Sequence, residues 1–474
     1  MPTNLTASSA AFTRRRLRNL PAVAASARRL PTPSPAGTCA PRHLVDRALA
    51  EPVARAYHYL DVVQDAYVKG GEPRLLQSYN NESELLTTAF VYDNALAALA
   101  YLANPTVANV RRARLIGDAL LWVQAHDERY ADGRVRQAYA AGPMRFYGDG
   151  PAFPGLRREG GRAAHLWPFG FGGSSTGDMA WAALALAQLY VDTRIAKYLD
   201  GTVALGLWIA GQESGHRHGG YHGGRQADGE TPERWASTEH NVDAYALFAL
   251  LAKLTRDRAW TARADVAAAF VRRMWNPAGR HFWTGTGEDP EVINTGNVPE
   301  DVQSWGLLGL GEDRYDAAVD WVTTHLANTD GPVSGVTYSS QAKVVTDPVS
   351  GSALPSNPHA VWLEGTAHTA LALLKRGRTG DAGRARQLLQ ALVTAQETLG
   401  AGQTVGRTGD PHGGRLANPG EGGTWTGAPL PAASGIVAAT SAFETGFGFG
   451  YFGRQHVGTT AWFLMAAQNF NPYQ

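Results

Sequence analysis

The chain has 474 residues, of which 44% are hydrophobic and 18% are charged. This length and composition allow a large buried core and differ from those of disordered proteins. The formal net charge is +1, yet residues 1–47 contain eight arginines and a single acidic residue, so the rest of the chain is mildly acidic. Such a body has no broad basic face for nucleic acid, which requires clustered Lys and Arg side chains.

The first 42 residues are rich in Ala, Ser, Pro and Arg, and we predict a basic, disordered tail there. The segment 14–16 resembles a twin-arginine export signal, but Pro21 interrupts the apolar run that follows it. Because no convincing signal peptide and no run of 18 apolar residues is present, we expect a cytoplasmic protein without a membrane span, with export left open. The single cysteine, Cys39, excludes an internal disulfide and a thiolate metal site.

Six stretches of apolar and small residues follow in the chain, and each begins with an acidic residue or a histidine. They start at Asp93, Asp178, Glu239, Asp301, Glu364 and His456. Three of the five intervals between these residues are close to one another, at roughly 62 residues, which indicates an internal repeat. Since these stretches have no polar face, they are predicted to be helices that are buried on all sides.

Six other stretches carry an apolar stripe and a charged face, the pattern of a helix with one side in water. They span residues 43–66, 107–126, 193–213, 257–275, 313–328 and 381–397. Alternation of half-exposed outer helices with dry inner helices, six of each, predicts an all-α (α/α)6 toroid in a single catalytic domain, residues 43–474. The alternatives are an open helical solenoid and a double barrel similar to that of squalene cyclases.

The loops that lead from outer to inner helices are long and rich in Gly and aromatic residues, whereas the return connections are short. We therefore expect one elaborated rim, with possible short β-ribbons, where the inner helices begin. The six residues that begin the inner helices would face a common funnel there. Each one alone is also a normal helix cap. Like charges that converge in a partly dry site raise the pKa of at least one carboxyl, as acid and base catalysis requires.

Two motifs at this rim contain more than a cap. In residues 235–243, Glu239 is followed by His240 and Asn241, and Asp243 lies one helical turn further along the same face. In residues 362–368, the same spacing places His368 below Glu364, with Trp362 just before the helix. These carboxyl, imidazole and amide groups suit a ligand with many hydroxyls, although a cap over a buried core histidine is the competing interpretation for the second motif.

Aromatic rings in the long loops would supply apolar faces for sugar rings. Clefts that bind sugars are typically lined by aromatic side chains and a few polar groups. The remaining substrate-binding candidates are Asp93, Trp235, Trp305, Trp362, Glu444 and His456.

The glycine-rich stretches follow no strand of a βαβ unit and contain no Walker lysine, so they do not predict a nucleotide site. His216, His218 and His222 suggest a metal site only weakly, and we expect neither a metal nor a cofactor.

With its sixfold helix alternation and the stretches 238–243, 300–305 and 362–366, the body resembles the (α/α)6-barrel carbohydrate-active enzymes, the six-hairpin glycosidase-like group. The resemblance implies a sugar-binding funnel and an inverting reaction between two carboxyl groups. We therefore expect a glycoside hydrolase that acts on an oligo- or polysaccharide, with Glu239 as general acid and Asp301 or Asp178 as general base. The alternatives are a sugar epimerase or isomerase, a non-catalytic glycan-binding protein, a lyase and an isoprenoid cyclase. Sugar identity, linkage and oligomeric state are left open.

Overall fold

The computed structural model describes residues 44–67, 70–80, 85, 87–142, 156–157, 159–165, 171–407 and 425–474. The chain separates into two units, Met1–Ala40 and Pro41–Gln474, and the account below concerns the second. The predicted tail lies outside the described residues.

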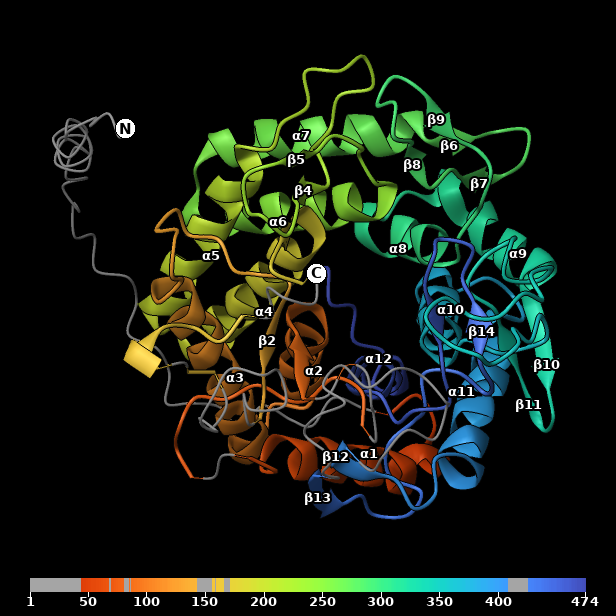
Figure 1. The fold of residues 1–474 in the computed structure, drawn as a ribbon. Coiled ribbons are helices and arrows are strands. Elements are labelled where there is room, and N and C mark those ends of the chain that lie inside the picture. Colours follow the sequence, from red (N-terminus) through yellow and green to blue (C-terminus); the bar gives the residue numbers. More distant parts are fainter. Residues whose placement is uncertain are drawn as a thin grey trace, which may run out of the picture. The chain divides into compact units, whose positions relative to one another are not determined.

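Twelve α-helices are found in the described part of the second unit, and they alternate between an inner and an outer layer (Figure 1). The inner helices are α2 (Val91–Ala103), α4 (Thr176–Thr193), α6 (Thr238–Thr255), α8 (Asp301–Leu310), α10 (Leu363–Arg376) and α12 (Val457–Ala467). The outer helices are α1 (Ala50–Gln64), α3 (Val107–Ala125), α5 (Ala196–Ala210), α7 (Arg258–Arg273), α9 (Asp316–His325) and α11 (Asp381–Thr398).

The inner helices form a closed ring. Each packs against the next in chain order, and α12 packs against α2, which closes the circle. In Figure 1 the helices follow one another around this ring from red α1 to blue α12. The predicted (α/α)6 toroid is therefore confirmed, and the contact between α12 and α2 excludes an open solenoid for this unit.

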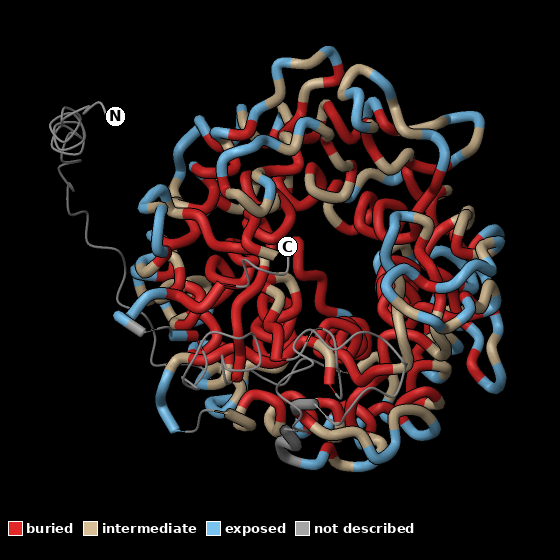
Figure 2. The backbone as a smooth tube through the Cα atoms, viewed as in Figure 1, coloured by how far each residue is buried: buried red, intermediate tan, exposed pale blue. Residues whose placement is uncertain are grey.

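The burial of the two helix layers follows their sequences. Every residue of α12 is buried, and α2, α4, α8 and α10 are buried over most of their length, as their lack of a polar face predicts. In α6 only half of the residues are buried, so the prediction of burial on all sides is wrong for this helix. In α7, by contrast, Trp260, Ala264, Ala267 and Val271 form one buried stripe, while the charged residues remain outside. Figure 2 shows the same division, with buried backbone in the inner layer and exposed backbone in the peripheral loops.

The two ends of the ring differ in the length of their connections. Helices α4, α6, α8 and α10 end in residues with a left-handed backbone, which turns the chain into the next outer helix within a few residues. The long loops lie at the other end, where the inner helices begin. Ser175 and Ser237 cap α4 and α6 there by accepting backbone N–H groups.

The predicted short ribbons are present in these loops as small antiparallel sheets. Among the described 3₁₀ turns, Glu159–Gly161 lies in a long loop, whereas Arg47–Leu49 directly precedes α1 and Asp313–Tyr315 lies in the short connection between α8 and α9. The paired strands are β1 (Thr88–Phe90) with β2 (Ala138–Ala140), β6 (Trp275–Asn276) with β7 (His281–Phe282), β8 (Gly285–Thr286) with β9 (Ile293–Asn294), β10 (Ala327–Asp330) with β11 (Val333–Val336), β12 (Thr404–Arg407) with β13 (Trp425–Pro429), and β14 (Phe443–Glu444) with β15 (Gly450–Tyr451). A three-stranded sheet joins β3 (Ser174–Ser175), β4 (Gly224–Arg225) and β5 (Pro232–Glu233).

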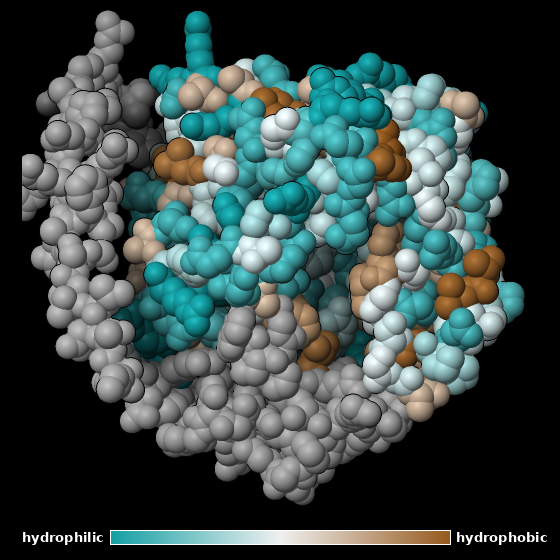
Figure 3. All heavy atoms as spheres, turned by 45° about the horizontal axis from the view of Figure 1, so that its top comes forward, coloured by the Kyte–Doolittle hydropathy of each residue, from teal (hydrophilic) through white to brown (hydrophobic). Residues whose placement is uncertain are grey.

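On the face drawn in Figure 3, hydrophobic residues are scattered among hydrophilic ones. None of the helices in the described ranges has the length and apolar character that a membrane crossing demands.

Candidate active site

A repeated hydrogen bond fixes the long loops to the starts of the inner helices. In five inner helices, an amide or hydroxyl oxygen near the first turn accepts the backbone N–H of a residue in the preceding loop. The pairs are Asn94 with Leu76, Asn241 with Tyr221, Gln303 with Phe282, Thr366 with Val336 and Thr460 with Ile436, at 2.7–3.1 Å. These bonds hold the elaborated rim in a defined position above the helix ends.

This device accounts for Asn241, which the sequence suggests as a sugar ligand. Its amide also donates to the carbonyl oxygens of Tyr221 at 3.1 Å and Ser237 at 2.8 Å, and the residue is fully buried. The structure therefore does not bring Asn241 to the acidic residues at the helix starts. Glu444 is likewise placed elsewhere, because its carboxylate accepts the backbone N–H of Ser350 at 3.0 Å in the loop beside β14.

On one side of the ring, two histidines bridge three carboxyl groups in a buried ion network of Asp93, Glu300, Glu364, His368 and His456. His456 Nε2 is hydrogen-bonded to Asp93 Oδ1 at 3.0 Å, and its Nδ1 lies 3.5 Å from Glu364 Oε2. Its ring stacks on Tyr79 with centroids 4.1 Å apart. Burial would lower the pKa of His456, but the charges of Asp93 and Glu364 outweigh it and raise the pKa.

His368 is the second cation of the ion network. Its Nδ1 is hydrogen-bonded to Glu300 Oε2 at 3.1 Å, and its Nε2 lies 3.7 Å from Glu364 Oε1. Burial opposes the charged form, but these two carboxyls raise the pKa of His368 to about 9. Conversely, burial would raise the pKa of Glu364, but the approach of His368 to 3.7 Å and the charge of His456 lower it instead. The network thus stabilises charged histidines and an ionised Glu364.

Glu300 was not a candidate from the sequence, although it directly precedes Asp301. It is fully buried and accepts hydrogen bonds from Thr369 at 2.8 Å and from Ser304. A signal was present in the sequence, because Glu300 and Asp301 are adjacent acids at the start of α8. Only one of two adjacent side chains can point in the same direction as the ionisable residues that begin the other inner helices. Tyr92, whose hydroxyl donates to Glu364 at 2.6 Å, was missed as well, because it looks like an ordinary core aromatic.

Next to the ion network along the ring lies a second group, the carboxyl cluster of Asp178, Glu239, Asp243 and Asp301, on α4, α6 and α8. None of these four carboxyls forms an ion pair with any residue in the described part of the chain. Burial, together with the charge of Asp301 and then of Asp243, Asp178 and Glu364, raises the pKa of Glu239 well above its usual value. Glu239 remains partly exposed, while the other three are buried.

The other three members of the carboxyl cluster are shifted in the same direction. Burial, opposed by the hydroxyl of Ser175, raises the pKa of Asp178 to about 7. Burial and the neighbouring charge of Glu300 raise the pKa of Asp301 to about 7. Burial also raises the pKa of Asp243, which accepts a hydrogen bond from Tyr473 at 2.8 Å. The expectation that converging carboxyls would become weaker acids is therefore met in the carboxyl cluster.

His240 lies next to the cluster without being charged. Burial lowers its pKa to about 4, although part of its surface remains accessible. Its ring packs beside that of Trp235, with centroids 5.4 Å apart, and the indole of Trp235 donates to Glu233 at 2.9 Å. A Cβ on Gly177 would come within 2.6 Å of the imidazole, so the glycine makes room for His240.

Aromatic rings connect the two groups. Trp305 contacts His368 at 5.2 Å, Trp181 at 5.3 Å and Trp462 at 5.9 Å between ring centroids. Trp362 stands perpendicular to His368 at 5.3 Å. The buried indole N–H groups of Trp305 and Trp362 have no hydrogen-bond acceptor among the described residues, so both can donate to a ligand oxygen.

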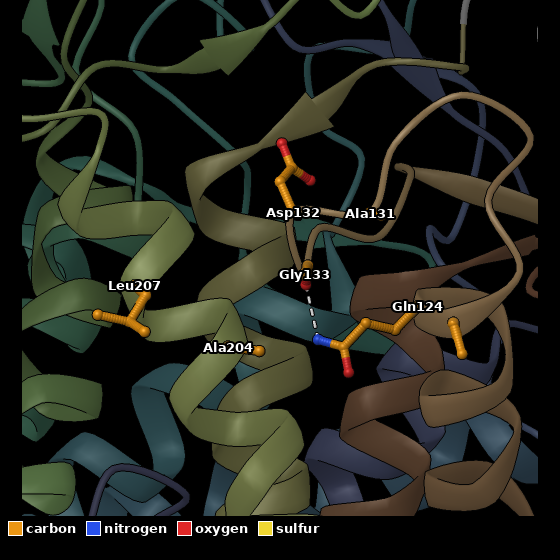
Figure 4. Close-up of a pocket in the computed structure, with 7 residues that line it drawn as sticks. Gln124, Ala131, Asp132, Gly133, Ala204 and Leu207 are labelled. Atoms are coloured by element: carbon orange, nitrogen blue, oxygen red, sulfur yellow. Dashed lines mark hydrogen bonds between the residues drawn. The ribbon is translucent and has the colours of Figure 1, made fainter. Parts of the chain in front are cut away.

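Two other features carry no catalytic groups. A pocket of about 420 Å³ lies between α3, α5 and residues 131–133, away from the carboxyl cluster, and its Asp132 is paired with Arg134 (Figure 4).

In the suggested histidine site, His216 is hydrogen-bonded to the Glu291 carboxylate at 2.8 Å, and His218 is hydrogen-bonded to the carbonyl oxygen of Glu291 at 3.0 Å. The described ranges hold no group of three or more His, Cys, Asp or Glu side chains suited to a metal.

Comparisons with known proteins support the fold and do not decide the activity. No family model and no curated protein matches the sequence. Solved structures with the same architecture include a D-mannose isomerase (10% identity, TM-score 0.55, 90% of this chain and 97% of that chain) and a wild-type glycosidase (13%, 0.53, 90% and 99%). They also include a GH76 α-mannanase from Bacteroides thetaiotaomicron (10%, 0.51, 89% and 97%). The chain therefore has the six-hairpin (α/α)6 fold found in these carbohydrate-active proteins, and no specific family is assigned to it.

Proposed function

We propose that the protein is a glycoside hydrolase that acts on an oligo- or polysaccharide. The carrying observation is the pair Glu239 and Asp301 on the neighbouring helices α6 and α8. Asp301 contributes the largest charge effect to the raised pKa of Glu239. Two carboxyls whose environments shift their pKa values differently are the usual acid and base of glycosidases.

The roles follow from the two environments. Glu239 is the proton donor because burial and the charge of Asp301 raise its pKa well above the usual value, and its partial exposure lets it reach the glycosidic oxygen. Asp301, with a pKa of about 7, is ionised in a large fraction of molecules and accepts a proton from water as the water oxygen attacks the anomeric carbon. The leaving sugar departs as an alcohol, and we expect the inverted anomer as product. Asp178 is the second choice for the base, because its charge affects Glu239 less.

We expect other groups at the starts of the inner helices to bind the substrate. Glu364 and Asp93, held by the histidines of the ion network, offer carboxylate oxygens to sugar hydroxyls, and the free indole N–H groups of Trp305 and Trp362 offer donors. Glycosidases of this fold among the solved structures support a carbohydrate substrate.

A sugar isomerase or epimerase is the second candidate, favoured by the likeness to D-mannose isomerase and by the neutral, partly exposed His240. Moving a proton between carbon atoms needs an unprotonated base that reaches the sugar, and a histidine can act as that base only in its neutral form. His368 is fully buried and its pKa of about 9 keeps it protonated, and His456 is also buried with a raised pKa. Only one accessible neutral histidine remains near the carboxyl cluster in the described ranges, which favours hydrolysis.

The proposal is tested with p-nitrophenyl glycosides and a panel of gluco- and manno-oligosaccharides of two to six units. We expect Glu239→Gln and Asp301→Asn each to lower turnover by at least about a hundredfold, with unchanged folding by circular dichroism. Glu51→Gln, an exposed acid on α1, is the control and should retain full activity. Near-normal turnover in both variants would refute these roles.

Incubation of free sugars in D₂O separates the two candidate functions. Deuterium at a sugar carbon, detected by mass spectrometry, identifies an isomerase or epimerase, whereas hydrolysis introduces none there. Binding of glycans without any reaction would indicate a non-catalytic binding protein.

A further inference from the structure

The loop between β14 and β15 exposes two phenylalanine rings. Phe447 is 37% exposed and Phe449 is 43% exposed. The other large hydrophobic residues with comparable exposure in the described ranges are aliphatic: Val107, Leu207, Val292 and Val344. Exposing two neighbouring rings to water is unfavourable, and exposed apolar patches often mark binding sites.

The loop that carries these rings is held firmly. Thr445 donates to the carbonyl oxygen of Phe449 through its backbone N–H at 2.9 Å and its hydroxyl at 2.6 Å. Gly446 and Gly448 have φ values of +80° and +83°, which other residues rarely adopt, so the two phenylalanines alternate with the glycines that bend the chain. Ser339 donates to the carbonyl oxygen of Thr445 at 2.7 Å and fixes the loop to the domain.

A single layer of aromatic side chains separates the exposed rings from the carboxyl cluster. The ring of Tyr338 lies edge-to-face with Phe447 at 6.0 Å and with Phe449 at 5.8 Å. The Tyr338 side chain is hydrogen-bonded to Asp301, and burial with the charge of Asp301 raises the pKa of Tyr338. Phe449 is also 5.8 Å from Tyr451, which packs against Trp362, the residue directly before α10.

We propose that Phe447 and Phe449 form a stacking platform for a sugar ring of an extended glycan, outside the carboxyl cluster. This inference rests on the proposed carbohydrate site and adds that the substrate is longer than the unit bound between Glu239 and Asp301. The C–H face of a pyranose matches a rigid aromatic face, and phenylalanine adds no hydrogen bond that would select one particular hydroxyl pattern. The platform therefore supplies length selection more than selection of the sugar type.

The test measures binding separately from turnover. In a Glu239→Gln background, Phe447→Ala and Phe449→Ala should each weaken binding of tetra- to hexasaccharides of the gluco and manno panel by about three- to tenfold in calorimetry, the range of one aromatic contact. Binding of the monosaccharides should stay unchanged. Phe449→Trp, which retains a ring, should preserve the affinity, and Val107→Ala, an exposed hydrophobic residue at the opposite end of the ring, should have no effect.

The outcomes distinguish this inference from the proposed function. Equal oligosaccharide affinity in the parent and both alanine variants, or no binding of any sugar of the panel, overturns the platform. Hydrolysis that depends on Glu239 with unaffected phenylalanine variants would refute the platform alone. Glycan binding that depends on the phenylalanines without any hydrolysis would refute the hydrolase alone.

Discussion

Substitution of Glu300 offers a direct test of the ion network. Glu300 is hydrogen-bonded to His368 and forms no hydrogen bond with a member of the carboxyl cluster in the described ranges. Replacement by Gln keeps the shape and an oxygen for Ser304 and Thr369, but it removes the ionised partner 3.1 Å from His368. Among the described residues, Glu364 would then be the one carboxyl within 4 Å of this buried cation, at 3.7 Å.

The size of the effect follows from the pKa of His368. A rise from 6.5 to about 9 corresponds to about 3 kcal/mol of folding free energy at low pH. Breaking a buried ion pair typically costs about 3–5 kcal/mol. Since Glu364 remains, we expect Glu300→Gln to lower the free energy of unfolding by about 2–3 kcal/mol at pH 6.

The pH dependence gives this prediction its sign. The folded pKa of His368 lies above the unfolded value, so its contribution is complete below pH 6.5 and is lost as the pH rises through about 9. The destabilisation by Glu300→Gln should therefore shrink between pH 6 and pH 9.5. Urea unfolding at four pH values, monitored by circular dichroism, measures this change.

Glu312→Gln serves as the matched control. Glu312 pairs with Arg272 and Arg314 at the surface, where such ion pairs contribute less than about 1 kcal/mol. If Glu300→Gln costs less than about 1 kcal/mol, or the same amount at every pH, the ion network does not stabilise His368 in the way described.

Two further predictions concern stability. Asn241→Ala should lower the free energy of unfolding by about 2–3 kcal/mol, because it leaves buried backbone groups of Tyr221 unpaired. Turnover should change by less than about threefold. A large loss of turnover in a folded variant would instead show that Asn241 belongs to the active site. The parent protein should be more stable at pH 5.5 than at pH 8.5. Asp178 and Asp301, with folded pKa values of about 7, and His368, at about 9, all bind protons more tightly in the folded state, so their contributions are lost as the pH rises through those values. Thermal unfolding at the two pH values checks this, and a higher midpoint at pH 8.5 would contradict it.

The fold could be predicted almost completely from the sequence. Helix α3 begins at the predicted residue and ends one residue before its predicted end, and α11 begins as predicted and ends one residue after it, because amphipathic stripes and capping residues are local signals. For α1 and α9, the predicted ranges are longer than the helices, since both ranges include a 3₁₀ turn before the helix and the range of α9 ends in strand β10.

The sequence by itself determined the closed ring of twelve helices and the placement of six ionisable residues at the starts of the inner ones, since both depend on periodicity along the chain. Only the tertiary structure decided how their charges are partnered. Glu300 and Asp301 are neighbours in sequence, yet one pairs with His368 and the other belongs to the carboxyl cluster. Asn241 follows His240, yet it binds loop backbone. The pKa of a buried group depends on which charges approach it through space, and these come from helices that are distant in sequence.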